Sequence, residues 1–512
     1  MKQIFKYFIL VNLLCGFNSC DILEENPKDF VSPQNFFNTE DEVTSALYGV
    51  YECMHNTYVG DTERILLGDL GVDILVCRDQ PHKNVYQHYL MDTPTVEMSD
   101  MWRAYYTGIG AANMVIDRTK SSELSPDFKN KIISEAKVLR AFFYHGLIMI
   151  WGDVPMWLEE LDLGKVSSLA RTSKQDIVNQ LYQDLDFAVK YLPETYESIY
   201  AGRLTSWAAK ALWARIALLN NDWQKAYELS SDIINNSSHK LLSNYEDVFN
   251  WKNKFNNELI WVIPCLTDIQ GSTIHSFASP RGRDESAVFN LLFSKGLKAL
   301  RPDGVEVSKS EELFEGWGMF CVSETYLSTF EEGDTRKKMM DWSSLTMSDG
   351  TVVKFNGGDG GGKGHYTLKW SAFGEKANNG SRDIHHIRLG EIYLIQAESA
   401  NELNKSKEAI GALNALRERA FGNTNHNYSQ SLSKDAIKSA IVNEHKWELG
   451  GEGVRRWYLN HWGFEYLKAA VESLKNENPK AAANIKEHHV LFKIPAEEFV
   501  KNPNLGSNNP GY

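Results

Sequence analysis

Residues 127–155, DFKNKIISEAKVLRAFFYHGLIMIWGDVP, carry the clearest structural signal in the chain. Apolar residues recur in this stretch at every third or fourth position, which is the spacing of one face of an α-helix. The residues on that face are Ile132, Ala136, Leu139, Phe143 and Leu147. Gly152 and Pro155 end the pattern, because both residue types are common where a helix stops. The sequence therefore predicts a long amphipathic helix.

Helical patterns continue on the C-terminal side of this stretch. Residues 172–193 begin with a Thr or Ser cap and stop at Pro193, and they predict a second helix. Residues 202–236 predict two helices joined at NNDW. Each of these two helices is amphipathic and needs a partner, so the pair is expected to form a hairpin that stacks on others.

A second copy of this hairpin occurs at residues 388–420. Three alanines of the second copy each lie 183 positions after an alanine of the first: they are Ala397, Ala400 and Ala409, after Ala214, Ala217 and Ala226. Small residues at matched places let paired helices approach closely, as in tetratricopeptide hairpins. The chain is thus predicted to be dominated by α-helices that stack in pairs.

Residues 265–385 lack this helical periodicity. They contain RGRDESA, NGGDGGGKGHY and FGEKANNGSRD, which are rich in glycine, asparagine and charge. Long irregular segments on a rigid scaffold commonly carry binding function. We therefore expect a helical scaffold, residues 35–264 and 386–512, to hold a loop-rich ligand-binding region at residues 265–385.

The first 20 residues, MKQIFKYFILVNLLCGFNSC, have the form of an export signal. Two lysines precede an apolar stretch that is too short to span a bilayer. Residues 1–19 are therefore expected to be a lipoprotein signal peptide, and Cys20 the lipidated first residue of the mature protein. Residues 20–34 are acidic and contain proline, which predicts an irregular tether. The alternative is a plain secretory peptide cleaved nearby, and in either case the protein leaves the cytoplasm.

The composition limits the kinds of partner. The chain has 512 residues, of which 43% are apolar and 24% charged, as in ordinary globular proteins. Its formal charge of −13 opposes binding to nucleic acid, which rests on many contacts from Lys and Arg to phosphate. No nucleic-acid partner is therefore expected.

Four cysteines fall in the mature body: Cys53, Cys77, Cys265 and Cys321. Their spacing contains neither CxxC nor another zinc-ligand pattern, so no metal site is predicted. Four cysteines allow three disulfide pairings, and buried free thiols are an equally good interpretation. Both alternatives stay open on the sequence alone.

Several motifs suggest phosphate binding, metal binding or hydrolysis, but none of them is complete. Residues 357–364, GGDGGGKG, resemble a phosphate-binding loop, but Gly364 stands where Ser or Thr should bind a metal ion, so we interpret them as a surface loop. His385 and His386 are adjacent and would point in different directions, so we expect them at a helix start and not on a metal. No cofactor is predicted. Carboxylates are abundant without an evident acid and base pair, so a glycoside hydrolase is not excluded.

Five segments occur in the order that one family shows. They are NFFNTEDEVTSALYGVYECM (35–54), MWRAYYTGIGAANMVID (101–117), SEAKVLRAFFYHGLIMIWGDVP (134–155), HIRLGEIYLIQAESANEL (386–403) and LFKIPAEEFVKNPNLGSNNPGY (491–512). Together they resemble the SusD/RagB family of outer-membrane nutrient-binding lipoproteins. The chain departs from the family pattern at His445, where Arg is usual, and at Tyr458, where Asp is common.

The resemblance implies a single all-α dominated domain over residues 35–512 with four tetratricopeptide-like helix pairs. It also implies a lipid-anchored protein of the outer membrane, facing the cell surface, that binds a glycan and acts as the lid of a SusC-like TonB-dependent transporter. Such a protein is not an enzyme. The acidic run after Cys20 resembles the surface-export signals of Bacteroidetes lipoproteins. Two other functions remain as hypotheses: an extracellular glycoside hydrolase, and a binder of a non-glycan nutrient such as a peptide.

Segments that resemble the binding regions of the family give six candidate ligand-binding residues. They are Asp73, Arg78, Trp102, Trp317, Arg281 and Tyr366. The tryptophans would stack on sugar rings, and Arg78 and Asp73 would form hydrogen bonds with hydroxyls. Trp102 at a helix start is more typical of a core, and Asp73 with Arg78 is also typical of a surface pair. Trp317 stands between two glycines, a setting that rarely anchors a core.

Overall fold

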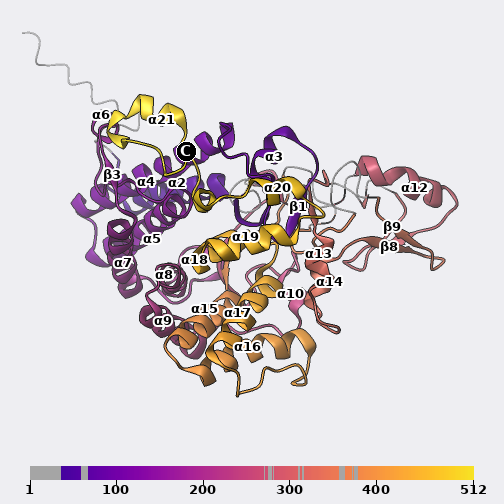
Figure 1. Ribbon diagram of the computed structural model, residues 1–512. Coiled ribbons are helices and arrows are strands. Elements are labelled where there is room, and N and C mark those ends of the chain that lie inside the picture. Colours follow the sequence, from indigo (N-terminus) through magenta and orange to yellow (C-terminus); the bar gives the residue numbers. More distant parts are fainter. Residues whose placement is uncertain are drawn as a thin grey trace, which may run out of the picture.

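The computed structural model describes residues 36–58, 67–269, 271–274, 280, 282–309, 312–313, 316–356, 364–371, 373 and 379–512. The expected signal peptide, tether and lipidated Cys20 lie outside these residues, as does most of the glycine-rich loop at 357–364. Helices dominate the described chain, with short strands between them (Figure 1). The predicted fold class is confirmed.

Helix α5 (Pro126–Trp151) is the long amphipathic helix that the apolar pattern predicts. Ser125 fixes its start, because the hydroxyl accepts a hydrogen bond from the Phe128 N–H and a proline occupies the first turn. Gly152 fixes its end with a φ of 72°, and donates its N–H to the carbonyl four residues earlier at 3.1 Å. Two residues at the ends of the helix, Ser125 and Gly152, therefore determine where it begins and where it stops.

The longer helices outside the loop-rich region pack against one another in a series that includes α5. They are α2 (Glu40–Tyr58), α4 (Val96–Ser121), α7 (Lys174–Tyr191), α8 (Ser206–Leu219), α9 (Trp223–Asn236), α15 (Leu389–Glu402), α16 (Ser406–Phe421), α17 (Lys434–Leu449), α18 (Arg455–Trp462) and α19 (Phe464–Ser473). Helix α5 contacts α2, α4 and α7; α7 contacts α8; and α8 and α9 contact α15. The helices thus form a continuous stack (Figure 1).

The two predicted hairpins are present and correspond position by position. Helices α8 and α15 begin 183 positions apart, at Ser206 and Leu389, and α9 and α16 begin at the same offset. Each hairpin turns at an asparagine with positive φ, Asn221 at 61° and Asn404 at 59°, a conformation that asparagine tolerates better than most residues. All six matched alanines are fully buried. The predicted close packing of these helices is confirmed.

The loop-rich region is entered and left through one antiparallel strand pair. Strand β4 (Leu259–Ile263) precedes the region, β10 (Ile384–Arg388) follows it, and the two strands are hydrogen-bonded to each other. His385 and His386 therefore lie in a strand, and the expectation of a helix start is wrong. The reason is that pairing with β4 holds this backbone extended, so that α15 begins only after it.

Within the loop-rich region the structure contains elements that the sequence pattern did not indicate. They are α12 (Gly282–Ser294), β5 (Ala299–Leu300), β6 (Glu306–Val307), β7 (Phe320–Val322), α13 (Glu324–Leu327), α14 (Arg336–Met340), β8 (Ser344–Met347) and β9 (Val352–Lys354). Strands β6, β5, β8 and β9 form a sheet that projects from the helical body beside α12 (Figure 1). Strand β7 instead pairs with β1 (Leu75–Cys77).

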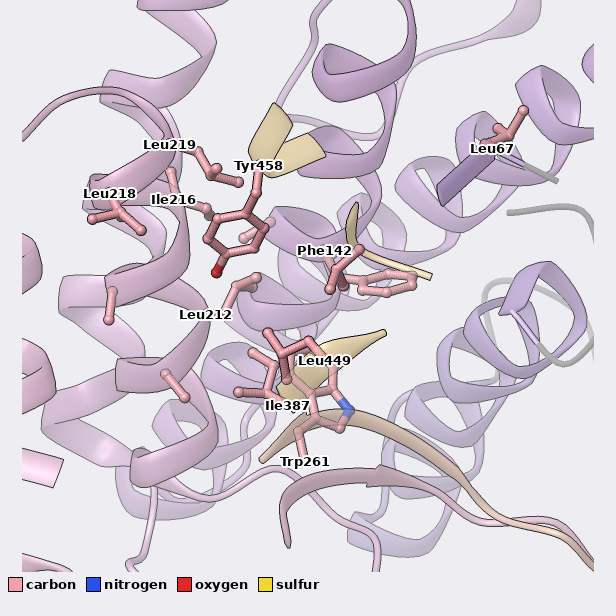
Figure 2. Close-up of a cluster of buried hydrophobic side chains, with 14 of the residues drawn as sticks. Leu67, Phe142, Leu212, Ile216, Leu218, Leu219, Trp261, Ile387, Leu449 and Tyr458 are labelled. Carbon is pink, nitrogen blue, oxygen red and sulfur yellow. The ribbon is translucent and has the colours of Figure 1, made fainter. Parts of the chain in front are cut away.

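The main apolar core runs through the helical stack. Figure 2 shows Phe142 of α5, Leu212 of α8 and Trp261 of β4 within it. A smaller core is built by the four-stranded sheet and its neighbours, and includes Trp342 and Tyr366. Because burial contributes roughly 25 cal/mol per Å² of apolar surface, the larger core supplies most of the apolar stabilisation.

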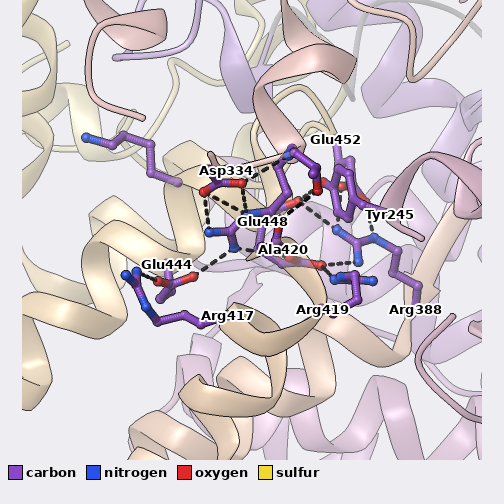
Figure 3. A network of polar contacts seen from close by, with 12 residues as sticks. Tyr245, Asp334, Arg388, Arg417, Arg419, Ala420, Glu444, Glu448 and Glu452 are labelled. Atoms are coloured by element: carbon purple, nitrogen blue, oxygen red, sulfur yellow. Dashed lines mark hydrogen bonds and ion pairs between the residues drawn. The ribbon is translucent and has the colours of Figure 1, made fainter. Parts of the chain in front are cut away.

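A buried network of arginines and carboxylates joins the loop-rich region to the helices (Figure 3). Arg336 of α14 pairs with Glu444 at 2.8 Å and with Glu448 at 3.4 Å, both on α17. Arg388 of β10 pairs with Glu448 at 2.5 Å and with Glu452 at 2.8 Å. Burial by itself would raise the pKa of Glu452, but the neighbouring cations, Arg388 first, outweigh burial and lower that pKa to about 2. Glu452 is therefore ionised inside the protein.

The two residues that depart from the family pattern contact each other. The ring centroids of His445 and Tyr458 lie 4.0 Å apart, and the Tyr458 hydroxyl donates a hydrogen bond to Glu391 at 2.8 Å. Burial lowers the pKa of His445 well below its usual value, so its ring is neutral at neutral pH. Aromatic packing occupies this position in place of an ion pair.

Candidate ligand-binding site

Trp317 is the one exposed tryptophan of the chain. All fourteen tryptophans lie in the described residues, and 37% of the Trp317 surface is exposed, whereas the others are buried or half-buried. Gly316 and Gly318 flank it, and Gly318 adopts a φ of 56°, which glycine reaches without strain. The segment then enters β7. Trp317 is thus presented at the surface next to a strand.

Arg78 lies beside the segment that carries Trp317. Strands β1 and β7 are antiparallel, with Cys77 opposite Phe320, and the Arg78 N–H donates a hydrogen bond to the Met319 carbonyl at 3.0 Å. The side chain of Arg78 is 4% exposed. The structure thus brings the backbones of two predicted residues together, although they are distant in sequence.

Asp73 is engaged within the protein. It is 8% exposed, and its carboxylate accepts hydrogen bonds from Arg455 Nη2 at 2.8 Å and Nε at 3.0 Å. Burial raises the pKa of Asp73, but Arg455 outweighs burial and lowers the pKa below its usual value. The carboxylate is therefore held against α18 in an internal ion pair. A contact between Asp73 and a ligand stays a prediction.

Trp102 belongs to a different part of the molecule. It is 4% exposed, and its ring lies edge-on to Trp151 and Tyr106, with centroids 5.1 and 5.0 Å away. It also lines a cavity of about 860 Å³, whose walls include α6 (Leu163–Val166) and α21 (Ala496–Lys501). Trp102 is therefore a core residue that also borders a cavity.

This cavity has aromatic residues that the sequence analysis did not single out. Tyr106 lies one helical turn after Trp102, so its spacing could have indicated it. Trp157 stacks on Tyr106, with ring centroids 5.1 Å apart and ring planes at 13°. At the rim, Glu498 accepts a hydrogen bond from Lys501 at 2.6 Å. The cavity thus combines an aromatic wall with a charged rim.

Tyr366 occupies the smaller core. It is 1% exposed, forms backbone hydrogen bonds with Trp342 at 2.9 and 3.1 Å, and packs against Phe355 with ring centroids 6.1 Å apart. The sheet that buries Tyr366 was not evident from the sequence. Arg281 lies outside the described residues. Ligand contacts by Tyr366 and Arg281 stay predictions.

Similarity to known proteins covers both ends of the chain. Residues 326–512 match the model of the SusD family, and residues 21–218 match a family described as starch-binding and associating with the outer membrane. A SusD-like protein of Formosa agariphila is 29% identical over 539 aligned positions, which cover 98% of each chain. The chain belongs to the SusD/RagB family. The resemblance inferred from the five segments is confirmed.

Solved structures with the SusD/RagB fold cover almost the whole chain. A laminarin-binding SusD-like protein has a TM-score of 0.74 at 22% identity, over 93% of this chain and 100% of that chain. Surface glycan-binding protein A from Bacteroides fluxus has a TM-score of 0.75 at 21% identity, again over 93% and 100%. At this level of identity the two structures establish the fold.

The family matches leave the middle of this SusD/RagB protein unassigned. Neither match covers residues 219–325, the interval that contains α12 and Trp317. The two family models therefore account for most of the scaffold, and the role of Trp317 rests on its position and exposure.

The remaining expectations about chemistry concern metals and thiols. In the described residues, no group of three or more His, Cys, Asp or Glu side chains is arranged to hold a metal ion. Among the described residues, Cys53, Cys77, Cys265 and Cys321 form no disulfide with one another, which favours thiols over the three disulfide pairings. Across the described ranges, no helix combines the length and the apolar character needed to cross a membrane.

Proposed function

We propose that this SusD/RagB protein binds a glycan at the cell surface and delivers it to a SusC-like TonB-dependent transporter of the outer membrane. The names of two similar solved structures support glycan binding, since one is called laminarin-binding and the other surface glycan-binding. Lipidation of Cys20 would hold the protein on the membrane, because acyl chains contribute about 0.8 kcal/mol per buried methylene. In this scheme the protein binds and releases its ligand without changing it.

The observation that carries the proposal is the exposure of Trp317. An indole ring left in water forgoes roughly 25 cal/mol for every Å² that burial would remove from solvent. The other thirteen tryptophans of this chain are more buried than Trp317. The flat face of an indole ring can stack on the apolar face of a sugar ring, which would cover this surface. The backbone of Arg78 lies beside the same segment, but Arg78 is buried, so a hydrogen bond from Arg78 to a sugar hydroxyl stays a prediction.

Affinity electrophoresis tests this proposal. The chain from Asp21 onward is run through gels that contain laminarin, starch, xylan or mucin glycans. We expect one of these glycans to slow the protein, and Trp317→Ala to weaken the binding roughly tenfold, because an aromatic contact is worth ~0.5–1.5 kcal/mol beyond its buried area. Tyr191→Ala is the matched control, since Tyr191 is also an exposed aromatic residue, at 46%, but lies at the end of α7.

Two results would contradict the proposal. If no glycan slows the unmodified protein, the ligand belongs to another chemical class. If new reducing ends appear while the protein is incubated with the glycan that it binds, the protein is a hydrolase and not a pure binding protein.

A peptide is the second candidate ligand, and the Trp102 cavity favours it. The cavity wall is largely aromatic and apolar, while Arg103, Glu498 and Lys501 give its rim charges of both signs. Such a cavity suits apolar side chains flanked by charged groups. Isothermal titration with a library of short peptides, with Tyr106→Ala beside the unmodified protein, tests this candidate. Heat of binding that Tyr106→Ala reduces would support it, and a blank library would remove it.

A further inference from the structure

Exposed aromatic side chains gather at a second place in the molecule. Among the described residues, five aromatic residues are exposed: Tyr48 (45%), Tyr191 (46%), Tyr200 (44%), Phe255 (39%) and Trp317 (37%). Three of these five, Tyr48, Tyr200 and Phe255, line two adjoining clefts. A group of exposed apolar residues around a concave surface is a candidate binding site.

The two clefts share one wall. Tyr48 of α2 lines the cleft of about 320 Å³, Phe255 lines the cleft of about 220 Å³, and Tyr200 and Arg203 line both. The shared wall belongs to the segment between α7 and α8. The cleft residues come from neither the β1 and β7 pair nor the segment of Trp317, so this is a separate surface.

A buried carboxylate holds this wall in place. Glu135 of α5 accepts hydrogen bonds from Arg203 Nη2 at 2.5 Å and Nε at 3.1 Å, from the Tyr196 hydroxyl at 3.0 Å and from the Tyr51 hydroxyl at 2.6 Å. The Tyr51 hydroxyl in turn accepts the Leu204 N–H at 2.9 Å. Because the wall is ordered before a ligand arrives, binding would cost little conformational entropy.

Arg203 also organises the exposed rings. Its guanidinium carbon lies 6.0 Å from the ring centroid of Tyr48, 5.9 Å from that of Tyr200 and 5.2 Å from that of Tyr196. Glu135 balances the positive charge of Arg203. The clefts therefore present flat rings and hydroxyl groups around a neutralised pair, and the carboxylates of Glu52 and Glu194 also line them. This chemistry suits a neutral ligand that has apolar ring faces and many hydroxyls.

We propose that the two clefts form a second saccharide-binding site on this chain. The inference rests on the proposed function, because it assigns the same class of ligand to a different surface. A polysaccharide carries many identical repeats, so two sites on one protein increase its retention through effective concentration, without a change in either site. The second site would thus help the protein to stay on a long glycan while the Trp317 site exchanges its contacts.

The test uses the same glycan gels and a titration with oligosaccharides cut from the glycan that slows the protein. The variants are Tyr48→Ala with Tyr200→Ala, Trp317→Ala, all three changes together, and Tyr191→Ala as the control. We expect two oligosaccharides per unmodified chain, one after the Tyr48 and Tyr200 changes, one after Trp317→Ala and none in the triple variant. Retention in the gel should fall roughly three- to tenfold when the two tyrosines are removed.

The possible results separate this inference from the proposed function. One oligosaccharide per unmodified chain, abolished by Trp317→Ala and unaffected by the tyrosine changes, would overturn the second site and leave glycan binding intact. Absence of binding by the unmodified protein to any glycan would overturn both. If the tyrosine variant unfolds at the same temperature as the Tyr191→Ala control, its loss of binding is local. This is the expected result, because both tyrosine side chains are half exposed.

Discussion

The helical scaffold and the loop-rich region of this chain are stabilised in different ways. The scaffold has a continuous apolar core, and its hairpins interlock at fully buried alanines such as Ala214 and Ala397. The described part of the loop-rich region has a smaller core around Trp342. It is also fastened to the scaffold by buried charges, since Arg336 reaches α17 and the Lys369 ammonium lies 2.8 Å from Glu452.

This difference indicates how one chain combines a fixed frame with a variable binding surface. Close apolar packing constrains every side chain along an interface, so the scaffold tolerates few changes in shape. The loop-rich region shares only part of the scaffold's apolar core, through residues such as Phe320 and Met340, and is fixed elsewhere by ion pairs, so much of its remaining surface is free to differ. Trp317, the exposed aromatic residue of the proposed glycan site, lies in this region, next to β7.

The largest effect is expected when one ionic anchor is removed. In Arg336→Met the buried carboxylates of Asp334 and Glu444 lose a partner that contacts them at 2.6 and 2.8 Å. Breaking a buried pair on one side costs about 3–5 kcal/mol of the free energy of unfolding, because the remaining charge is left buried. Urea denaturation followed by circular dichroism measures the loss.

An exposed ion pair provides the control for this variant. Arg103 pairs with Asp100 at 3.2 Å, and their side chains are 67% and 58% exposed. Arg103→Met should change the free energy of unfolding by no more than about 1 kcal/mol, as is usual for surface pairs. Equal losses in the two arginine variants would show that the charges do not anchor the loop-rich region.

The same network predicts a loss of stability in acid. The pKa of Glu452 is about 2 in the folded protein, whereas an unperturbed glutamate has a pKa of about 4.3. A folded pKa below the unfolded one gives stability that is complete above about pH 4.3 and is lost as the pH falls towards about 2. The loss attributable to Glu452 is on the order of 3 kcal/mol.

Urea denaturation at a series of pH values from 5 to 3 tests this dependence. Glu452→Gln should flatten the slope of unfolding free energy against pH in that interval. Glu306→Gln, at a side chain that is 56% exposed in its pair with Lys298, should keep the slope of the unmodified protein. An unchanged slope in Glu452→Gln would mean that other carboxylates control the acid response.

Local sequence patterns were sufficient for the helical frame. Caps such as Ser125 and Gly152 act on neighbouring backbone groups, and apolar periodicity acts within one helix, so both are visible in a short stretch of sequence. The offset between the two hairpins also extends to their turns at Asn221 and Asn404. These features depend on residues that are close in the chain.

Features that depend on distant residues were not predicted. Arg388 and Glu448 form a 2.5 Å ion pair although they belong to a strand and a helix that are far apart in sequence. The strand at His385 forms because β4 supplies its partner. Tyr366 is buried because separate strands assemble a small sheet around it. Neither charge pairing nor strand pairing across such distances leaves a local pattern.

The candidate binding residues also divide into those with a local sequence signal and those that depend on distant parts of the chain. The glycines on either side of Trp317 indicated a position outside the core, and the side chain is exposed. The exposed rings of Tyr48 and Tyr200 were missed, because a tyrosine in an amphipathic helix or between two helices is compatible with either a core or a surface. Their grouping emerges only when α2 and the segment before α8 lie side by side.

An intermediate effect is expected where the scaffold hairpins interlock. Ala397→Leu adds volume at a fully buried position, and overpacking of this kind costs about 1–3 kcal/mol. Ala214→Leu, at the matched position of the other hairpin, should lose a similar amount. Ala469→Leu on the exposed side of α19 is the control and should be close to neutral. Stability is measured by urea denaturation. Equal stability of all three variants would contradict the interlocked arrangement.

The smallest effect on stability is expected at Trp317 in the loop-rich region. Its contrast with Trp102 in the scaffold tests whether Trp317 is available to bind a ligand. Trp317→Ala removes a side chain that is 37% exposed and should lower the free energy of unfolding by about 1 kcal/mol. Trp102→Ala empties a position that is 4% exposed in the scaffold and should cost about 3–5 kcal/mol. If Trp317→Ala instead lost several kcal/mol, the indole ring would be part of the loop-rich core. Its exposure would then no longer point to a ligand, and a glycan would no longer be expected at this surface.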